Sequence, residues 1–403
     1  MKIVSALSTL SSAPALAQDI EAQIQSALGA PPDLVILFIS YQLADTFGSI
    51  VSMVRESLRP GHLLAVAGES VLGGEQEIER SPAVSALAIS CPTAKLRSFH
   101  LAAEDWQDYF SDEDFFLRQM SPAEAGAAGP EEPVRAFFLF GDPFTTPIVQ
   151  LLDVCSRYFP KAPIIGGMAS GLDKPDDSRL ALNDQIFSSG VVGVSFAGAI
   201  EIDCLVSQGC RPIGETFVVT KSYQNVVEQL DGKPALAAIE EMVSALPLLD
   251  RQLLANGGLQ VGRVIDQGKG SYGRGDFLIR SLVGVKRETG AVLVGDILRA
   301  GQTLQFHVRD AKTADEEMRL LLEGETLLSS AAAPPAGALL VSCNGRGTKL
   351  FDKPHHDIAL AHDILGQVPI AGFFAAGELG PVGDKNFIHG HTAVIAIFRE
   401  ATA

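Results

Sequence analysis

Two arginines are the residues of this chain whose type and surroundings best suit the binding of a small acid. Arg211 lies in SQGCRPIG and Arg346 lies in SCNGRGTKLF, and the glycines beside each predict a turn at the end of a strand. A guanidinium group stays charged and presents a planar pair of donors that matches two carboxylate oxygens. We therefore predict that Arg211 and Arg346 anchor a carboxylate, with a surface salt bridge as the alternative. Cys210 precedes Arg211 and is predicted to join this site, although such a cysteine is also typical of core packing.

Two glutamates could accept the amino group of a small zwitterion. Glu378 in AAGELGPVG and Glu69 in VAGESVLGG occupy corresponding places, each after an apolar run and a glycine, and Ser170 stands near the same place in GGMASG. Open sheets bind ligands at the carboxyl ends of their strands. We therefore predict that Glu69, Glu378 and Ser170 contact a ligand. Capping of a turn amide is the alternative.

A pair of histidines separated by one residue is a further candidate. On an extended chain the spacing of His389 and His391 puts both imidazoles on one face, which suits a metal ion or an anionic ligand. Because the pair precedes the apolar run TAVIAIF, burial with internal hydrogen bonds is an equally simple alternative. We predict ligand contact without a metal, with Asn344 and Asn386 helping His389 to orient the ligand.

Motifs of the common cofactor and enzyme classes are missing from the sequence. The segment from Gly268 to Gly273 has the G-x-G-x-x-G spacing, but it leads into the predicted strand FLIRSLVGV, whereas a dinucleotide site needs a helix there. The sequence has no P-loop, no G-x-S-x-G elbow and no H-E-x-x-H pair. We predict no cofactor and no catalytic residue, which favours a protein that is not an enzyme.

Three copies of one pattern must position these residues. Each copy has an apolar run, a helix-like stretch, a second apolar run that breaks into glycines, and a third apolar run. The copies cover Leu34 to Ser90, Ala136 to Gly198 and Gly337 to Phe398. Between the second and third copies, the stretch from Asp276 to Asp310 predicts an antiparallel meander. We predict a mixed fold, α/β or α+β, in which repeated units form sheets with flanking helices in two domains.

Composition excludes several classes of partner. The chain has 403 residues, 47% of them hydrophobic, and a formal net charge of -17. An acidic chain is a poor partner for nucleic acid, and no apolar run approaches the roughly 18 residues of a membrane span. Five widely spaced cysteines favour a reducing compartment. We predict a soluble, cytoplasmic protein that binds neither nucleic acid nor membrane.

The first residues allow two interpretations. MKIVSALSTLSSAPALAQ ends in Ala15-Leu16-Ala17, the small-x-small pattern of a signal cleavage site. Serines and a threonine interrupt its middle, however, and its basic start is weak. We prefer a strand followed by a helix within residues 1–30, packed on the first domain.

Several long segments resemble one known family. SQGCRPIG, QLDGKPAL, SCNGRGTKLF, AAGELGPVG and FIHGHTAVIAIF are similar to segments of the bacterial FIST proteins, named for F-box and intracellular signal transduction, and PIIGGMASG resembles their N-terminal half. The resemblance implies a FIST N-terminal domain over residues 31–222 and a FIST C-terminal domain over 223–403. It also implies a sensor of small ligands, with amino acids as the suggested ligands. Family members are often fused to kinases, chemoreceptors or cyclases. Because this chain ends at Ala403 after its last predicted strand, we expect a separate protein partner to carry the output.

Three hypotheses about function follow. The first is a sensory protein that binds a small ligand, such as an amino acid or a small carboxylate, in a pocket shared by the glycine turns. The second is an uncharacterised enzyme that uses the cleft between the domains, with His389 or His391 as general base or with both as metal ligands beside Glu378. The third is a scaffold whose surface recruits another protein.

Overall fold

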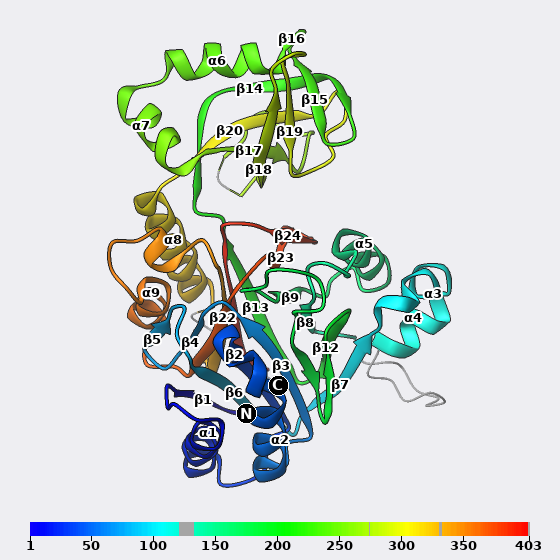
Figure 1. The fold of residues 1–403 in the computed structure, drawn as a ribbon, viewed down its shortest axis with the longest axis vertical. Coiled ribbons are helices and arrows are strands. Elements are labelled where there is room, and N and C mark those ends of the chain that lie inside the picture. Colours follow the sequence, from blue (N-terminus) through cyan, green and yellow to red (C-terminus); the bar gives the residue numbers. More distant parts are fainter. Residues whose placement is uncertain (121–132, 274, 330–332, 402–403) are drawn as a thin grey trace. The chain divides into compact units, whose positions relative to one another are not determined.

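The computed structural model describes residues 1–120, 133–273, 275–329 and 333–401. These residues form two compact units (Figure 1). The first contains Met1–Ser207 and Arg319–Ala403, and the second contains Gln208–Met318. The compact units therefore do not follow a linear division of the chain into halves, because the second unit is inserted into the first. Helices and sheets occur in both, and the sheets of the first unit combine parallel and antiparallel pairs, which confirms the predicted mixed fold.

Three six-stranded sheets build the first unit. The first sheet has the order β1 (Lys2–Ser8), β6 (Val84–Ser90), β2 (Leu34–Ser40), β3 (His62–Gly68), β10 (Leu180–Leu182) and β11 (Gln185–Phe187). The second has the order β7 (Ala94–Leu101), β12 (Val191–Gly198), β8 (Ala136–Gly141), β9 (Ile164–Met168), β23 (Glu378–Val382) and β24 (Lys385–His389). The third has the order β13 (Ile200–Ser207), β25 (Ala393–Glu400), β21 (Gly337–Cys343), β22 (Ile370–Ala375), β4 (Val71–Gly73) and β5 (Gln76–Ile78).

Each sheet is centred on one parallel pair of strands. The pairs are β2 with β3, β8 with β9, and β21 with β22. A helix joins the two strands of each pair: α2 (Phe47–Leu58), α5 (Ile148–Tyr158) or α9 (His356–Leu365). A crossover helix is the usual solution for parallel neighbours, since a tight turn cannot join them. The three pairs correspond to the three copies of the sequence pattern.

A hairpin from each copy completes the sheet of another copy. The hairpin β4–β5 follows β3 in the chain, but β4 pairs with β22. In the same way β10–β11 follows β9 but β10 pairs with β3, and β23–β24 follows β22 but β23 pairs with β9. The exchange is cyclic, because each copy gives one hairpin and receives one. Segments that are hundreds of residues apart are thereby joined by backbone hydrogen bonds.

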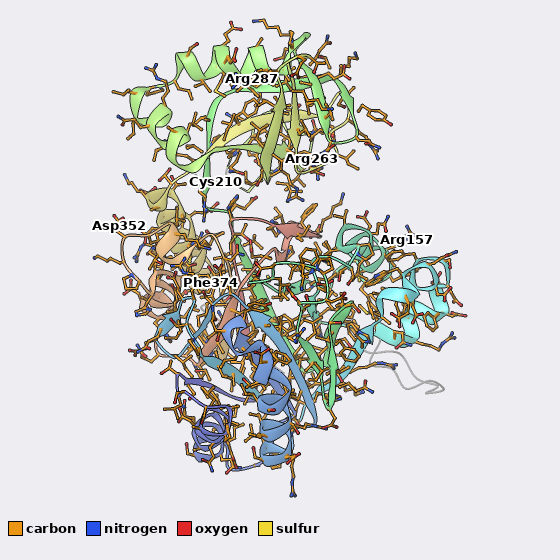
Figure 2. All side chains as sticks on the ribbon, in the orientation of Figure 1. Arg157, Cys210, Arg263, Arg287, Asp352 and Phe374 are labelled. Atoms are coloured by element: carbon orange, nitrogen blue, oxygen red, sulfur yellow. The ribbon has the colours of Figure 1, made fainter. Side chains whose placement is uncertain are left out.

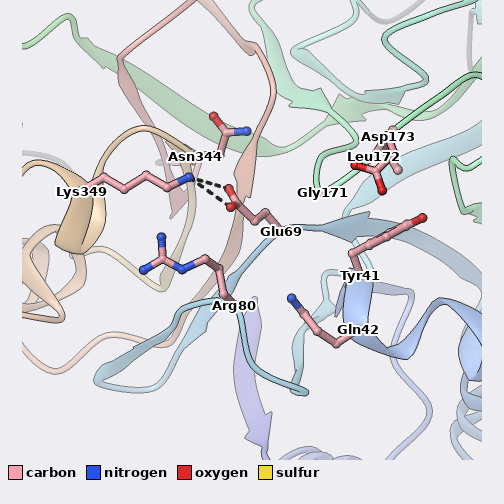
Figure 3. A pocket seen from close by; sticks show the side chains of 9 residues that line it. All are labelled: Tyr41, Gln42, Glu69, Arg80, Gly171, Leu172, Asp173, Asn344 and Lys349. Carbon is pink, nitrogen blue, oxygen red and sulfur yellow. Dashed lines mark hydrogen bonds and ion pairs between the residues drawn. The ribbon is translucent and has the colours of Figure 1, made fainter. Parts of the chain in front are cut away.

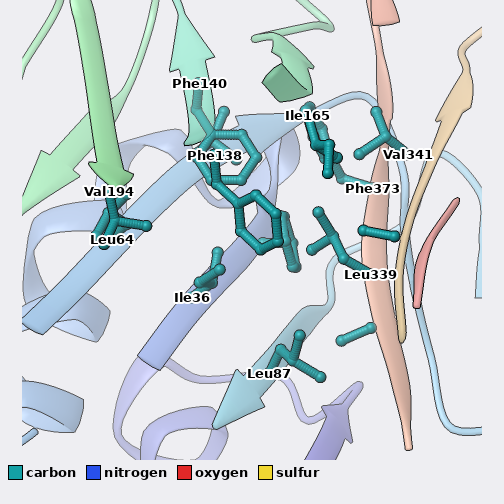
Figure 4. Close-up of a cluster of buried hydrophobic side chains, with 14 of the residues drawn as sticks. Ile36, Leu64, Leu87, Phe138, Phe140, Ile165, Val194, Leu339, Val341 and Phe373 are labelled. Atoms are coloured by element: carbon teal, nitrogen blue, oxygen red, sulfur yellow. The ribbon is translucent and has the colours of Figure 1, made fainter. Parts of the chain in front are cut away.

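The core of the first unit lies between the three sheets. Alternate residues of β2 point to opposite faces, so that Ile36 and Phe38 pack centrally while Val35, Leu37 and Ile39 pack on the helices. The central cluster also takes residues from the other two sheets, including Phe138 of β8 and Leu339 of β21 (Figure 4). Burial of each such side chain is worth roughly 1.5–3 kcal/mol.

Aromatic rings join these sheets across the core. The Phe38 ring stacks on Phe373 of β22 at 5.4 Å between centroids, and it meets Phe140 of β8 edge-on at 5.8 Å. Phe374, the next residue of β22, is buried as well (Figure 2). The interior thus connects all three copies into one body.

Helices cover the outer faces of the sheets. α1 (Ala13–Leu28) begins after Ser12, whose hydroxyl accepts a hydrogen bond from the Ala15 amide at 3.4 Å, and it ends at Gly29 in the left-handed conformation. It packs beside α2 (Figure 1). Its apolar positions Leu16, Ile20 and Ile24 recur at a spacing of four residues and are fully buried. Two further helices, α3 (Trp106–Ser111) and α4 (Glu113–Met120), follow β7.

The second unit is one seven-stranded antiparallel sheet with helices. Its order is β14 (Cys210–Tyr223), β20 (Thr303–Arg309), β17 (Leu259–Val264), β18 (Phe277–Lys286), β19 (Ala291–Val294), β15 (Val226–Leu230) and β16 (Lys233–Pro234). The helices α6 (Ala235–Ala245) and α7 (Leu248–Gly257) belong to it, as does the first part of α8 (Ala311–Leu328), up to Met318. The predicted meander is correct for β18 and β19 but wrong for β20, which pairs with β14 and β17. The apolar alternation of β20 identifies a strand but carries no information about its neighbour.

Candidate functional site

A polar pocket of the first unit lies where the central strands of all three copies end. Its volume is about 490 Å³. It is lined by Tyr41, Gln42, Glu69, Arg80, Gly171, Leu172, Asp173, Asn344 and Lys349 (Figure 3). We call it the strand-end pocket. Tyr41 follows β2, Glu69 follows β3, Gly171 lies after β9 and Asn344 directly follows β21. The carboxyl ends of parallel strands are the usual place for ligands in such sheets.

Opposite charges line opposite sides of the strand-end pocket. Lys349 donates hydrogen bonds to both carboxylate oxygens of Glu69, at 3.0 and 3.1 Å, and Arg80 extends beside this pair. Figure 3 shows Tyr41 and Asp173 on the other side. Burial, followed by the carboxylates of Asp177 and Asp173, raises the pKa of Tyr41, so its hydroxyl remains a hydrogen-bond donor at neutral pH. The pocket therefore offers two cations at one side, where Glu69 is paired with Lys349, and the Asp173 carboxylate at the other.

Ser170 holds the strand ends behind the pocket. Its buried hydroxyl accepts a hydrogen bond from the Glu69 amide at 2.7 Å and donates one to the Phe374 carbonyl. The Ser170 amide donates to the Ala67 carbonyl at 3.2 Å. One small side chain thus ties the ends of β3, β9 and β22 together. Ser170 fixes the backbone of Glu69, whereas its own side chain does not line the pocket.

A second set of contacts orients the two cations. Both carboxylate oxygens of Glu79 bind Thr348, one accepting from its amide at 2.8 Å and the other from its hydroxyl at 2.6 Å. These two hydrogen bonds hold η3 (Gly347–Lys349) and so position its last residue, Lys349. The second cation, Arg80, follows β5, and its amide donates a hydrogen bond to the hydroxyl of Ser70, between β3 and β4, at 3.0 Å. Arg80 itself takes the left-handed conformation, with φ of 48°.

Glycine at position 171 is required by the shape of the pocket wall. Its φ is +79°, and a Cβ atom added there would lie 2.9 Å from the Tyr41 Cβ and 3.2 Å from the Glu69 Cα. Any larger residue would push the chains of two copies apart. Gly171 therefore permits the close approach that brings Tyr41 and Glu69 into one pocket.

The Arg346 guanidinium is buried and pairs with a carboxylate of the protein. It donates to both oxygens of Asp357, from Nε at 2.7 Å and from Nη2 at 2.8 Å, and it lies 5.2 Å from the centre of the Phe351 ring. Ser342 and His356 also bind Asp357, at 2.7 and 3.0 Å. Burial alone would raise the pKa of Asp357, but the Arg346 charge outweighs it and lowers that pKa. Both oxygens of Asp357 are thus hydrogen-bonded, as a buried carboxylate requires.

Glu77 connects this pair to the exchanged hairpin. Its Oε1 accepts hydrogen bonds from the amides of Asp357 and Ile358, at 2.9 and 3.1 Å, and so caps the start of α9. Burial and the neighbouring Asp357 carboxylate raise the pKa of Glu77 to about 8. Nothing in the local sequence of β5 predicts this contact, because its partners lie 280 and 281 residues away.

Glu378 is fully buried beside the same cluster. Its Oε2 accepts hydrogen bonds from the amide and the hydroxyl of Thr392, at 3.1 and 2.8 Å. Burial raises the pKa of Glu378 to about 7, although the bonds from Thr392 oppose the shift. In this structure Glu378 holds the turn before β25 and does not line the strand-end pocket.

The predicted residues after β23 hold the exchanged hairpin in place. Asn386 donates to the Ala162 carbonyl at 3.0 Å and accepts from the Ile164 amide at 2.8 Å. His389 is buried, with Nε2 3.0 Å from the Gly380 carbonyl. His391 lies in the turn after the hairpin, with φ of 69°. These contacts fasten β24 to its partner strand and to the segment before β9.

Arg211 and Cys210 belong to the second unit. The Arg211 guanidinium pairs with Asp250 and, at 3.2 Å, with Asp310. Hydrogen bonding to Asp250 raises the pKa of Arg211. Cys210 is buried at the start of β14, against Val264, Phe277 and Ile279.

The structure therefore brings part of the predicted site together. Glu69 and Asn344 line the strand-end pocket and Ser170 lies directly behind it, whereas Arg346, Glu378, Asn386 and His389 contact other groups of the first unit. A ligand role for the predicted residues stays a prediction.

Five polar side chains of the lining were not predicted: Tyr41, Gln42, Arg80, Asp173 and Lys349. Lys349 belongs to the same SCNGRGTKLF segment as Arg346, and Asp173 follows the GGMASG glycines, so their closeness to predicted turns was an available signal. No sequence signal indicated Arg80, because it follows the hairpin β4–β5, whose position depends on pairing with a strand of another copy.

The described part of the chain contains neither a metal-binding cluster nor a membrane-spanning helix. In that part, no group of three or more His, Cys, Asp or Glu side chains is arranged to hold a metal ion. No helix among the same residues has the length and apolar character needed to cross a membrane.

Comparison with known proteins gives matches over nearly the whole chain. The FIST N domain family matches residues 33–233, and the FIST C domain family matches residues 235–381. The chain is similar to Uncharacterized protein MT0656 of Mycobacterium tuberculosis (strain CDC 1551 / Oshkosh), with 36% identity over 92% of both chains. It is also similar to Uncharacterized protein Mb0898c of Mycobacterium bovis, with 35% identity over 92% of this chain and 91% of that protein.

A solved structure of T. maritima PurL complexed with FGAR is a distant match. It covers 99% of this chain and 72% of that chain, but at 11% identity and a TM-score of 0.22 it does not establish a common fold. The family matches are much stronger, and FIST domains are associated with signal transduction and small-ligand sensing. On these matches the chain belongs to the FIST family, with a FIST N domain followed by a FIST C domain.

Proposed function

We propose that this protein is a small-ligand sensor of intracellular signal transduction, and that the strand-end pocket binds a free amino acid or a related small carboxylate. One observation carries the proposal. The pocket joins the strand ends of all three copies and places Lys349 and Arg80 on one side and Asp173 on the other. A zwitterion has the matching arrangement, because its carboxylate suits the cations and its ammonium group suits the carboxylates.

The Glu69–Lys349 ion pair would be exchanged for contacts with the ligand. Both side chains are partly exposed, so the pair contributes little to stability and is inexpensive to open. The ligand carboxylate would take Lys349 and Arg80, and its ammonium group would take Glu69 or Asp173. Tyr41, Gln42 and Asn344 would supply neutral hydrogen bonds that fix orientation. The apolar wall is small in this pocket, which favours a polar ligand.

A signal would arise if the ligand favoured one arrangement of the pocket over another. Lys349 ends η3, which is held by Glu79 of the segment after β5 and follows the buried Arg346. A ligand that draws Lys349 away from Glu69 acts directly on this segment. We propose that a separate protein partner in the cytoplasm reads the change.

A panel of amino acids tests the proposal by thermal stabilisation. A ligand that binds the folded protein raises its stability by about 2.7 kcal/mol at roughly 100 times its Kd. We expect at least one free amino acid to raise the melting temperature in a concentration-dependent way. Its N-acetyl derivative and its carboxamide should each bind at least about tenfold more weakly, because each lacks one of the two charges.

Two results would contradict the proposal. One is the absence of any shift with all common amino acids and small dicarboxylates at millimolar concentration. The other is equal stabilisation by the free amino acid and by both derivatives, because a bipolar pocket must distinguish them.

A further inference from the structure

A second pocket, contained within the second unit, has a different chemical character. It lies between α6 and the strands β14 and β15, with a volume of about 460 Å³. Its floor is apolar and includes Phe217, Leu230, Met242 and Leu246. We call it the α6 pocket. Its size falls within the range of about 300–1,000 Å³ that is usual for sites of small molecules.

An irregularity of β14 forms one wall of the α6 pocket. Ile213 pairs with Phe306 and Thr216 pairs with Gln305, so Gly214 and Glu215 have no partners in the ladder. Such a bulge changes the direction of the side chains it contains. Gly214 has φ of +62°, and a Cβ atom there would lie 2.6 Å from the Met242 Cγ. The backbone thus approaches a flexible methionine, which can adapt to an apolar guest.

The rim of the α6 pocket is acidic. It carries the carboxylates of Glu215, Asp231 and Glu241 and the ammonium group of Lys233. Lys233 is already bound to Glu241 at 2.6 Å. Asp231 accepts a hydrogen bond from the Val218 amide at 2.9 Å. Two negative charges at the mouth of an apolar cavity are therefore not balanced by Lys233.

We propose that the α6 pocket binds a small hydrophobic amine, whose apolar body fills the floor and whose ammonium group lies at Glu215, Asp231 and Glu241. Charge complementarity decides the class, because an anion would meet an acidic rim and a strongly polar zwitterion would leave the apolar floor unfilled. This ligand differs from the zwitterion of the strand-end pocket. The proposal concerns residues of the second unit alone and does not depend on the proposed sensor function.

Fluorine NMR on the full chain tests the ligand class directly. The probe is para-fluorophenethylamine, and its matched analogues are the neutral para-fluorophenethyl alcohol and the anionic para-fluorophenylacetate. We expect the amine to show concentration-dependent line broadening and to bind about five- to tenfold more tightly than the alcohol, with the anion weakest. Absence of amine binding, or equal affinity for amine and alcohol, would overturn the proposal. So would preference for the anion.

Three variants locate the binding. Glu215→Gln should weaken amine binding about two- to fivefold and leave alcohol binding unchanged. Glu240→Gln is the control, because it removes the same charge from an exposed position on α6 that does not line the pocket. Ala245→Phe fills the pocket from an exposed lining position and should abolish binding of both amine and alcohol. Retention of amine binding by Ala245→Phe, with an unchanged circular dichroism spectrum, would place the amine elsewhere and refute the assignment.

Discussion

The Arg346 guanidinium and the Asp357 carboxylate form a two-bond ion pair in which both side chains are almost completely buried, with exposed fractions of 0% and 1%. This pair lies in the first unit, between the loop after β21 and the start of α9. Loss of one partner would leave the other charge buried without compensation.

Asp357→Asn should therefore lower the free energy of unfolding of the first unit by about 3–5 kcal/mol. Urea denaturation followed by the fluorescence of Trp106 measures this, since the chain has one tryptophan and it lies in that unit. Asp363→Asn is the matched control, because Asp363 of the same helix pairs with Arg319 at the surface, at 3.0 Å. The control should change stability little. Equal effects of the two substitutions would show that burial of the pair is not decisive.

The stability of the first unit should fall as the pH rises from about 5 to 8. The pKa of Glu77 is raised to about 8 and that of Glu378 to about 7, both from an ordinary value of 4.5. In this pH range the folded protein therefore holds protons that the unfolded chain has released. For each such proton, the free energy of unfolding falls by up to about 1.4 kcal/mol when the pH rises by one unit.

Glu77→Gln should flatten this pH dependence, while its amide oxygen can still cap α9. Melting temperatures between pH 5 and 8 provide the measurement. Glu75→Gln, an exposed neighbour in the same hairpin, should leave the slope as it is. A slope unaffected by Glu77→Gln would mean that this carboxylate is ionised throughout the range.

Gly171→Ala should damage the strand-end pocket more than a comparable glycine substitution elsewhere. Gly171 and Gly383 both have positive φ, +79° and +60°, so alanine costs about 1–2 kcal/mol of backbone strain at each. Only the Cβ at position 171 would also meet Tyr41 and Glu69, whereas nothing lies within 4 Å of a Cβ at 383. We expect Gly171→Ala to have the lower melting temperature and to lose amino-acid binding. Retained affinity in Gly171→Ala would argue against this pocket as the ligand site.

Lys349→Met should weaken binding of the amino-acid ligand at least about tenfold while hardly changing the stability of the ligand-free protein. The methionine keeps the apolar stem but removes the charge that is proposed to hold the ligand carboxylate. Calorimetric titration gives the affinity, and Lys353→Met, an exposed lysine of the following turn, is the control. If the carboxamide derivative loses as much affinity as the free amino acid in Lys349→Met, Lys349 does not bind the ligand carboxylate.

The repeated pattern predicted the strands of the first unit because each strand corresponds to a short run of apolar residues. LVILFIS, AFFLFGD and GALLVSC became β2, β8 and β21, and the glycines after the second apolar runs lie where the pocket is built. Glu69 and Asn344 were predicted in this way, because the end of an apolar run indicates which residues follow the strand.

Contacts between segments far apart in the chain could not be predicted from the sequence. Arg346 resembled a ligand anchor from its glycines, but its partner Asp357 lies across a turn, in a helix whose start is capped by Glu77 of another copy. Lys349 of the third copy reaches Glu69 of the first at the sheet edge where the hairpin of the first copy pairs with β22. Alternation of apolar residues shows that a strand exists but not which strand it joins, and the pocket depends on that choice.

The cyclic exchange of hairpins makes the three copies depend on one another. One copy alone would have a sheet lacking its last two strands and a hairpin lacking a partner. Removal of any one copy would therefore leave a second copy with an exposed sheet edge and the third with an unpaired hairpin. Unpaired strand edges are sites of aggregation, so truncation of the chain within the first unit should yield an insoluble product.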